Sequence, residues 1–152
     1  KFPQVDKLWL LTGEGQMFAD ARTRGPQIPF YDVDVEHGLK HLEHLEPESN
    51  LILSPVGACD LAMCYTGRAM GALVPPGTVV LLKAVDRDAI IPGGEYAIVS
   101  RKIVTLRIVR AADEEDKVRL VAGDRENYDD ILLNVSDIVA VYKVKGKLII
   151  NS

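Results

Sequence analysis

The chain has 152 residues, of which 47% are hydrophobic and 26% are charged, and its formal net charge is -4 at pH 7. This balance is typical of a folded globular domain and excludes a disordered chain, while the length favours one domain with a short extension. The negative charge also excludes a broad phosphate-binding surface, because such a surface needs an excess of Lys and Arg.

The hydrophobic runs and the first residues indicate where the protein works. No apolar run reaches the ~18 residues that a membrane-spanning helix needs, and the N-terminal residues lack the basic, apolar and small-residue order of a signal peptide. We therefore expect a cytoplasmic protein that contacts no membrane. Because the sequence begins with Lys1 and not with Met, we also expect it to be the later part of a longer protein.

The N-terminal part divides into two segments of different composition. An apolar run, Trp9-Leu10-Leu11, is followed by Thr-Gly-Glu-Gly, which indicates a short anchor that ends in a turn. Residues 19–29 have little apolar content, which is typical of an exposed linker. We therefore predict a short N-terminal segment over residues 1–18, a linker over 19–27 and the main domain over 28–150.

The main domain begins with a predicted strand. Residues 28–35 alternate apolar and acidic side chains in their second half, the period of a half-buried strand, and Pro29 restricts them to a strand start or an edge. The next segment, residues 36–49, is rich in His, Glu and Leu. It predicts a short solvated helix or an ordered loop that ends at Pro47.

The rest of the chain predicts further strands. Short β-branched or apolar runs alternate with Pro-Gly, Gly-Gly or acidic turn segments. The runs are residues 51–53, 61–65, 78–83, 95–100, 103–110, 118–122 and 138–144. The predicted fold class is therefore mostly β, with compact, curved, mainly antiparallel sheets or a partly open barrel.

Two stretches of the sequence resemble a known family. Residues 5–17, with the Trp-Leu-Leu-Thr-Gly-Glu-Gly run, resemble the end of the helix-turn-helix domain of many phage-type repressors. Residues 28–149 are similar in order and spacing to the C-terminal, signal-peptidase-like domain of LexA and phage repressors. The family's Gly-Asp/Asn-Ser-Met turn falls on Gly67-Arg68-Ala69-Met70. Its Pro falls on Pro75 or Pro76, and its Gly-Asp and apolar strand fall on Gly77-Thr78 and residues 79–82.

The resemblance implies a serine nucleophile at position 69 and a lysine base within residues 105–109. This sequence has Ala69, which lacks an attacking oxygen, and Arg107, which stays protonated and is a poor base. The family's self-cleavage bond falls at His37-Gly38, where a bulkier residue precedes the glycine. We therefore predict a degenerate peptidase with no catalytic residue and a vestigial cleft formed by Gly67, Arg68, Ala69, Met70 and Arg107.

The resemblance also implies a role. A homodimer of this domain would position two preceding helix-turn-helix domains on the two half-sites of one DNA operator, so that residues 1–18 would be the short helical tail of such a domain. No cofactor and no metal are expected, and a regulatory protein partner would replace self-cleavage as the signal. We predict residues 139–150 as the dimer interface, because a strand near a domain end can pair with its twofold mate.

Two other functions stay open. The domain would be an active self-cleaving serine peptidase if the serine–lysine dyad of the family were wrongly assigned to positions 69 and 107. Ser54, or Ser100 with Lys102, would then be the substitutes. Alternatively, the vacated cleft would bind a peptide or a small anion, with Arg107 as the recognition group. A plainer interpretation is that residues 67–70 are only a turn and that Arg107 is a half-exposed strand residue paired with a carboxylate.

Three other groups of residues have simple interpretations. His37, His41 and His44 would share one face of a helix and could bind a transition metal, but solvated histidines are more common. Cys59 and Cys64 have no histidine at zinc-ligand spacing, so we predict buried free thiols. The acidic residues 113–116 predict a solvated hairpin tip.

Overall fold

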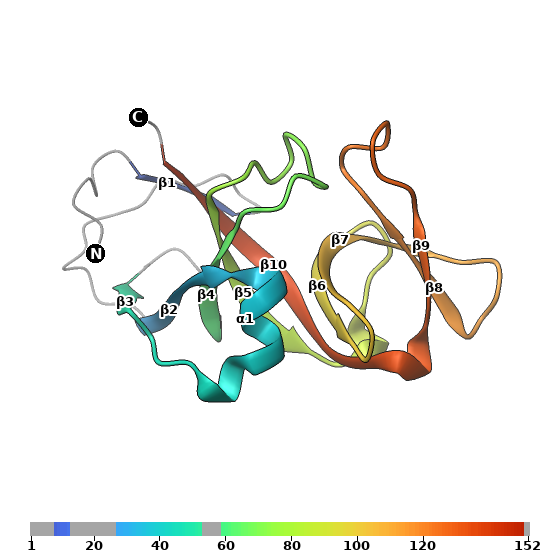
Figure 1. The fold of residues 1–152 in the computed structure, drawn as a ribbon, viewed down its shortest axis with the longest axis horizontal. Coiled ribbons are helices and arrows are strands. Elements are labelled where there is room, and N and C mark those ends of the chain that lie inside the picture. The colour runs from blue at the N-terminus through green and yellow to red at the C-terminus, as the bar shows by residue number, and fades with distance from the viewer. Residues whose placement is uncertain (1–7, 13–26, 53–58, 151–152) are drawn as a thin grey trace.

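The computed structural model describes residues 8–12, 27–52 and 59–150 (Figure 1). These residues form one mixed sheet of ten strands with short helical segments beside it. Along the main path the strand order is β3-β2-β4-β5-β10-β6-β7-β8-β9, and β1 pairs with β10 beside this path. The β2–β4 pair is parallel and the other pairs are antiparallel. The prediction of a mostly β, mainly antiparallel domain is confirmed, and the sheet ends at β3 and β9 without closing.

Strands predominate along the whole described chain, and the helical segments between them are short. In chain order the elements are β1 (Leu8–Thr12), β2 (Gln27–Asp34), α1 (Val35–Gly38), the 3-10 helix η2 (Leu39–His44), β3 (Ser49–Ile52), β4 (Leu61–Tyr65), β5 (Thr78–Val85), η3 (Arg87–Ala89), β6 (Glu95–Ser100), β7 (Val104–Ala111), β8 (Lys117–Val121), β9 (Ile131–Asn134), η4 (Val135–Asp137) and β10 (Ile138–Ile150).

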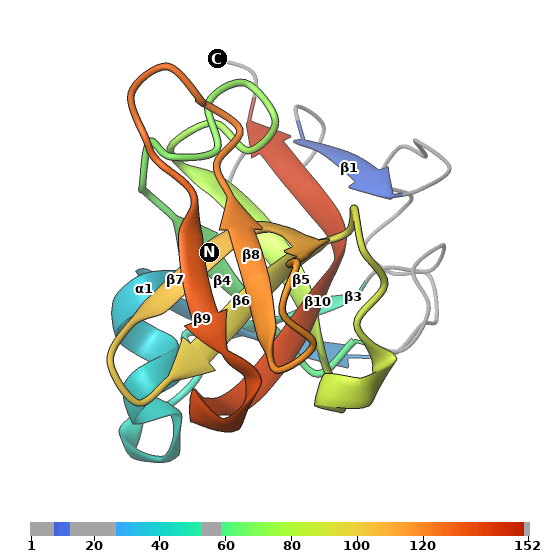
Figure 2. The same ribbon diagram turned by 90° about the vertical axis from the view of Figure 1, so that its right-hand side faces the viewer.

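The long strand β10 organises the sheet. One of its sides pairs with β5, while its other side pairs first with β6 and then with β1. Figure 2 shows β10 as the long red strand, with β1 beside its C-terminal end. The prediction that residues 139–150 form an edge for pairing with a twofold mate is therefore wrong, because both sides of this strand are already hydrogen-bonded within the chain.

The N-terminal prediction needs a second correction. Within the expected helical tail, residues 8–12 form strand β1, because β10 continues beyond its pairing with β6 and its backbone groups from Gly146 to Ile150 accept a further partner. The rest of the tail and linker residues 19–26 lie outside the described residues. Gln27, the last residue of the predicted linker, already belongs to β2. The boundaries proposed at residues 18 and 28 stay predictions.

The remaining elements agree with the predictions, with one omission. The runs from residue 61 onward form strands close to the expected bounds, and the 36–49 segment forms α1 and η2, which end before Pro47. Strand β9 (Ile131–Asn134) was not predicted. It has four residues and forms by pairing with β8.

Of three apolar clusters among the described residues, two cover opposite faces of strand β6. The first core contains Val35 and Leu39 together with Tyr65, Met70 and Leu106. The second core contains residues of β6, β7 and β8, namely Tyr96, Ile98, Val109 and Leu120, with Leu133, Ile138 and Val141. Because side chains alternate along a strand, Arg107 shares the face of Val109 and lies beside Tyr96 across the β6–β7 pair.

The described helices include none that is long and apolar enough to cross a membrane.

Candidate functional site

The chain turns sharply after β4 at residues 67–71. The Gly71 amide donates to the Arg68 carbonyl at 3.1 Å, and Gly71 has a φ of 57°, a left-handed conformation that favours glycine. Ala69 is 6% exposed and Met70 is fully buried in the first core, whereas Arg68 is exposed. Of the four residues of the predicted vestigial turn, Ala69 and Met70 are therefore buried, whereas Gly67 and Arg68 reach the surface.

The loop of residues 123–130, which we call the clamp loop, holds this turn. The Asp124 amide donates to the Ala69 carbonyl at 2.9 Å. A Cβ atom added to Gly123 would collide with the carbonyl oxygen of Met70 and lie 3.0 Å from its Cα. Side chains at position 123 would therefore separate the two backbones. The sequence analysis missed this role, because a close approach of two distant backbones leaves only an isolated glycine as its signal.

Arg107 contacts the other end of the clamp loop. It is 8% exposed, its Nη1 donates to the Asp129 carbonyl over a long 3.4 Å, and its guanidinium lies 5.9 Å from the centre of the Tyr128 ring. Its Nε is buried without an acceptor. Among the described residues no carboxylate forms an ion pair with Arg107. The interpretation of a half-exposed residue paired with a carboxylate is therefore wrong.

The segment that carries His37-Gly38 is fixed by Asp34. One carboxylate oxygen accepts from the Glu36 amide at 3.0 Å, and the other accepts from the amide and hydroxyl of Thr66, both at 2.7 Å. Asp34 therefore caps α1 and attaches it to the end of β4. Helix α1 also packs against β7.

The His37-Gly38 bond itself lies within α1. His37 is exposed and Gly38 is buried, where an added Cβ would come within 2.8 Å of the Met63 methyl group. Gly38 is thus held against β4, and no hydrogen bond joins it to Ala69 or Arg107 among the described residues. Access of this bond to the turn would require α1 to move.

Tyr65 lies among these elements and is fully buried. Burial, together with the Glu36 charge, raises the pKa of Tyr65 to about 12, against the opposing effects of the Met70 amide and the Arg107 charge. The hydroxyl faces the Met70 amide without reaching full hydrogen-bond geometry. It stays protonated at neutral pH and is therefore a poor nucleophile.

The Tyr65 pKa predicts a loss of stability at high pH. Above pH 10 the unfolded chain releases this proton while the folded protein retains it up to about pH 12. Unfolding then releases a proton, so the free energy of unfolding falls with rising pH, by up to about 2–3 kcal/mol for this group. Urea unfolding below pH 10 and near pH 12 should show a smaller loss in Tyr65→Phe. An equal loss in both proteins would assign the effect to other groups.

The predicted histidine face does not form. His37 lies in α1, whereas His41 and His44 lie in η2, and His41 interrupts the helical backbone with φ -125° and ψ 30°. All three side chains are exposed. Within the described residues no group of three or more His, Cys, Asp or Glu side chains could hold a metal ion.

The substitute dyad has a structural role. The Ser100 hydroxyl is buried, donates to the Ile103 carbonyl at 2.8 Å and accepts from the Ile103 amide at 2.9 Å, so it closes the turn between β6 and β7. Lys102 is exposed in that turn. Ser54 lies outside the described residues. Neither Ser100 nor Lys102 has the arrangement of a nucleophile beside a buried base.

The cysteines and the acidic segment have the following environments. Cys59 and Cys64 are free and only half-buried, so the prediction of full burial is wrong, because both lie at the margin of an apolar cluster. Burial, assisted by Asp32, raises the pKa of Cys64 to about 11, so its thiol stays protonated at neutral pH. Residues 113–116 form the exposed turn between β7 and β8, as predicted.

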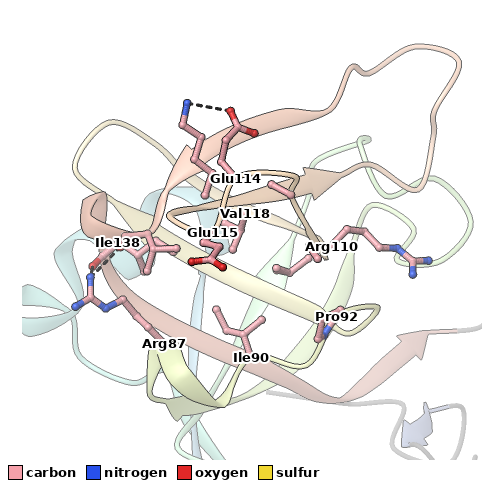
Figure 3. Close-up of a pocket in the computed structure, with 13 residues that line it drawn as sticks. Arg87, Ile90, Pro92, Arg110, Glu114, Glu115, Val118 and Ile138 are labelled. Carbon is pink, nitrogen blue, oxygen red and sulfur yellow. Dashed lines mark hydrogen bonds and ion pairs between the residues drawn. The ribbon is translucent and has the colours of Figure 1, made fainter.

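A pocket of about 320 Å³ lies away from these residues, between η3, the β7–β8 hairpin and η4 (Figure 3). Its floor includes Ile90, Val118 and Ile138. Arg87 is held at one end by the Val135 carbonyl at 2.8 Å. Glu115 also lines the pocket (Figure 3), whereas Ala69 and Arg107 do not. The sequence analysis did not anticipate this pocket.

Comparisons with other proteins add no assignment. A scan against protein-family models finds no match to this chain, and a search of curated proteins finds none either. The candidate site is defined by contacts alone and consists of the 67–71 turn, Arg107, the clamp loop and α1. The clamp loop contacts both the turn and Arg107, and α1 packs against β7.

Proposed function

We propose that this chain is the regulatory and dimerisation domain of a phage-type transcriptional repressor that has lost self-cleavage. In this proposal the domain is of the LexA type and works in the cytoplasm as a homodimer. It places two helix-turn-helix domains, which precede it in the full protein, on one DNA operator. A regulatory protein partner relieves repression.

One observation supports the proposal most directly. Three segments that are distant in sequence, α1, the turn and β7, come together. The clamp loop is hydrogen-bonded to Ala69 in the turn, at 2.9 Å, and to Arg107 on β7, at 3.4 Å, and α1 packs against β7. These three are the cleavage segment, the turn and the base-bearing strand in the family that the sequence resembles. Their contacts with one another and with the clamp loop favour a cleft of this peptidase type.

The chemistry of the cleft supports the loss of cleavage. Ala69 offers no nucleophile, and Arg107 retains its proton and cannot act as a general base. The end of β4 offers the hydroxyl groups of Tyr65, which stays protonated, and of Thr66, which is hydrogen-bonded to Asp34. No side chain among these can attack the His37-Gly38 bond at neutral pH.

The experiment restores both missing groups in the full-length protein. The parent is expected to keep its intact mass for days between pH 7 and pH 10, whereas Ala69→Ser combined with Arg107→Lys is expected to yield a cut at His37-Gly38. Cleavage should be slow, since α1 must first leave its site on β4, and faster at alkaline pH, where the lysine is neutral. Mass spectrometry of the intact protein measures both outcomes.

The matched control moves only the hydroxyl group. Ala72 lies in the same loop and is exposed, so Ala72→Ser with Arg107→Lys should remain uncut. A cut in the parent would contradict the loss of activity, and no cut in the restored variant would contradict a peptidase-type cleft. Sedimentation velocity tests the dimer, and a monomer at high micromolar concentration would contradict the dimerisation role.

A further inference from the structure

Arg107 has an unusual environment for a buried charge. A buried guanidinium normally pairs with a carboxylate, because an unpaired charge in the protein interior is costly. Arg107 is 92% buried, since 8% is exposed, and its described contacts are one long hydrogen bond to the Asp129 carbonyl and the Tyr128 ring. The positive charge thus has no counter-charge of its own among the described residues.

The guanidinium of Arg107 has a hydrogen-bond acceptor at one of its nitrogens and none at the other two. Nη1 donates to Asp129, whereas Nε is buried without an acceptor and Nη2 donates to no described residue. The two nitrogens with no acceptor are neighbours on the Nε–Nη2 edge. Two parallel donors on a planar edge match the two oxygens of a carboxylate, which binds such an edge through two charge-assisted hydrogen bonds.

We propose that the Nε–Nη2 edge of Arg107 is a binding site for a carboxylate, such as a peptide C-terminus, an acidic side chain or a small organic acid. A monoanion fits better than phosphate. Arg107 supplies one positive charge, and the clamp loop that it contacts carries the acidic residues Asp124 and Asp129. A dianion would leave an excess of negative charge in the site.

Entry of the ligand depends on the clamp loop. Because Nε is buried, the loop must shift to admit a carboxylate beside Tyr128. Its residues Arg125, Glu126 and Asn127 are exposed, so this movement exposes little additional apolar surface. The inference uses the same cleft as the proposed function but rests on the contacts of Arg107 alone, so it stands even if the restored dyad fails to cleave.

The direct test is the NMR signal of the Arg107 Nε–H group in the full, ¹⁵N-labelled protein. Its cross-peak is assigned by its disappearance in Arg107→Lys. Sodium acetate is titrated against sodium chloride at equal ionic strength. We expect the Arg107 cross-peak to move and saturate with acetate and to stay in place with chloride. A shift without saturation, or an equal shift of all arginine cross-peaks, would overturn the proposal.

Variants and ligands define the site further. Arg107→Lys keeps the charge but loses the paired edge, so acetate affinity by calorimetry should fall about tenfold or more. Arg110→Lys, on the same strand but exposed, should bind like the parent. If Arg107→Lys fails to fold, Arg107→Met assigns the cross-peak by its disappearance, and saturation of that cross-peak in the parent decides the question.

Three ligands distinguish the source of the carboxylate. Inorganic phosphate should bind more weakly than acetate, and phosphate binding as tight as that of acetate would contradict a monoanion site. A tripeptide with a free C-terminus that binds more tightly than acetate, while its amide does not bind, would assign the site to a peptide end. Equal binding of acetate and the free tripeptide would assign it to small carboxylates in general. Binding of the amide would contradict carboxylate recognition.

Discussion

Replacing Gly123 by alanine is expected to lower the free energy of unfolding by about 3 kcal/mol, because the new Cβ meets the backbone of Met70 and not a flexible side chain. Relief of this collision requires the clamp loop and the 67–71 turn to separate. The hydrogen bond from the Asp124 amide to the Ala69 carbonyl would then lengthen or break. Urea denaturation measures the loss, and faster hydrogen exchange of the Asp124 amide reports the separation.

Gly77 provides the matched control for this substitution. It has a φ of 92°, and an added Cβ would meet nothing within 4 Å, so Gly77→Ala introduces backbone strain without a collision. The expected loss is about 1–2 kcal/mol. Equal losses at the two positions, with unchanged exchange at Asp124, would mean that the close contact between Gly123 and Met70 does not constrain the site.

Replacing Arg107 by glutamate is expected to lower the free energy of unfolding by about 3–5 kcal/mol, because a carboxylate would be buried beside the Asp129 carbonyl without a partner. Arg107→Met should be different. It removes a buried charge and the unpaired Nε–H while retaining a side chain of similar length, so stability should stay within about 1 kcal/mol of the parent or rise. Urea denaturation at neutral pH measures both variants.

An exposed residue of the same strand serves as the control. Arg110→Glu should change the free energy of unfolding by no more than about 0.5 kcal/mol, since this side chain lies in solvent. If Arg107→Met proved as costly as Arg107→Glu, the Arg107 charge would have a stabilising partner within the chain. A stable Arg107→Met variant that no longer binds acetate would instead show that this arginine serves binding at the expense of stability.

The two candidate binding regions of the molecule differ in what supports them. The region around Tyr65 contains the 67–70 turn and the His37-Gly38 segment, which the sequence resemblance had grouped with Arg107. For this region, Arg107 suggests a ligand that can be tested, a carboxylate. The pocket between η3 and η4 has an apolar floor and a lining that includes Glu115, with Arg87 engaged by backbone carbonyls. Nothing in the structure identifies what would fill it.

Sequence patterns were most informative where a local period was long enough. The runs at residues 61–65, 78–83 and 95–100 were recognised because several consecutive apolar or β-branched side chains favour an extended, buried backbone. Strand β9 was not recognised, and it is defined by its pairing with β8. The segment at residues 8–12 was expected to belong to a helical tail but forms a strand, because its pairing with β10 depends on a partner more than 130 residues away.

By itself, the sequence determined the mostly β class, the principal turns and the absence of a serine and a lysine at the two expected positions, since these depend on local composition and on residue identity. Only the tertiary structure decided which of these residues meet. Gly123 lies against Met70, Asp34 ties α1 to Thr66, and β10 is enclosed on both sides. Such contacts join segments that are distant in sequence, and their free energies come from packing and hydrogen bonds that no local pattern encodes.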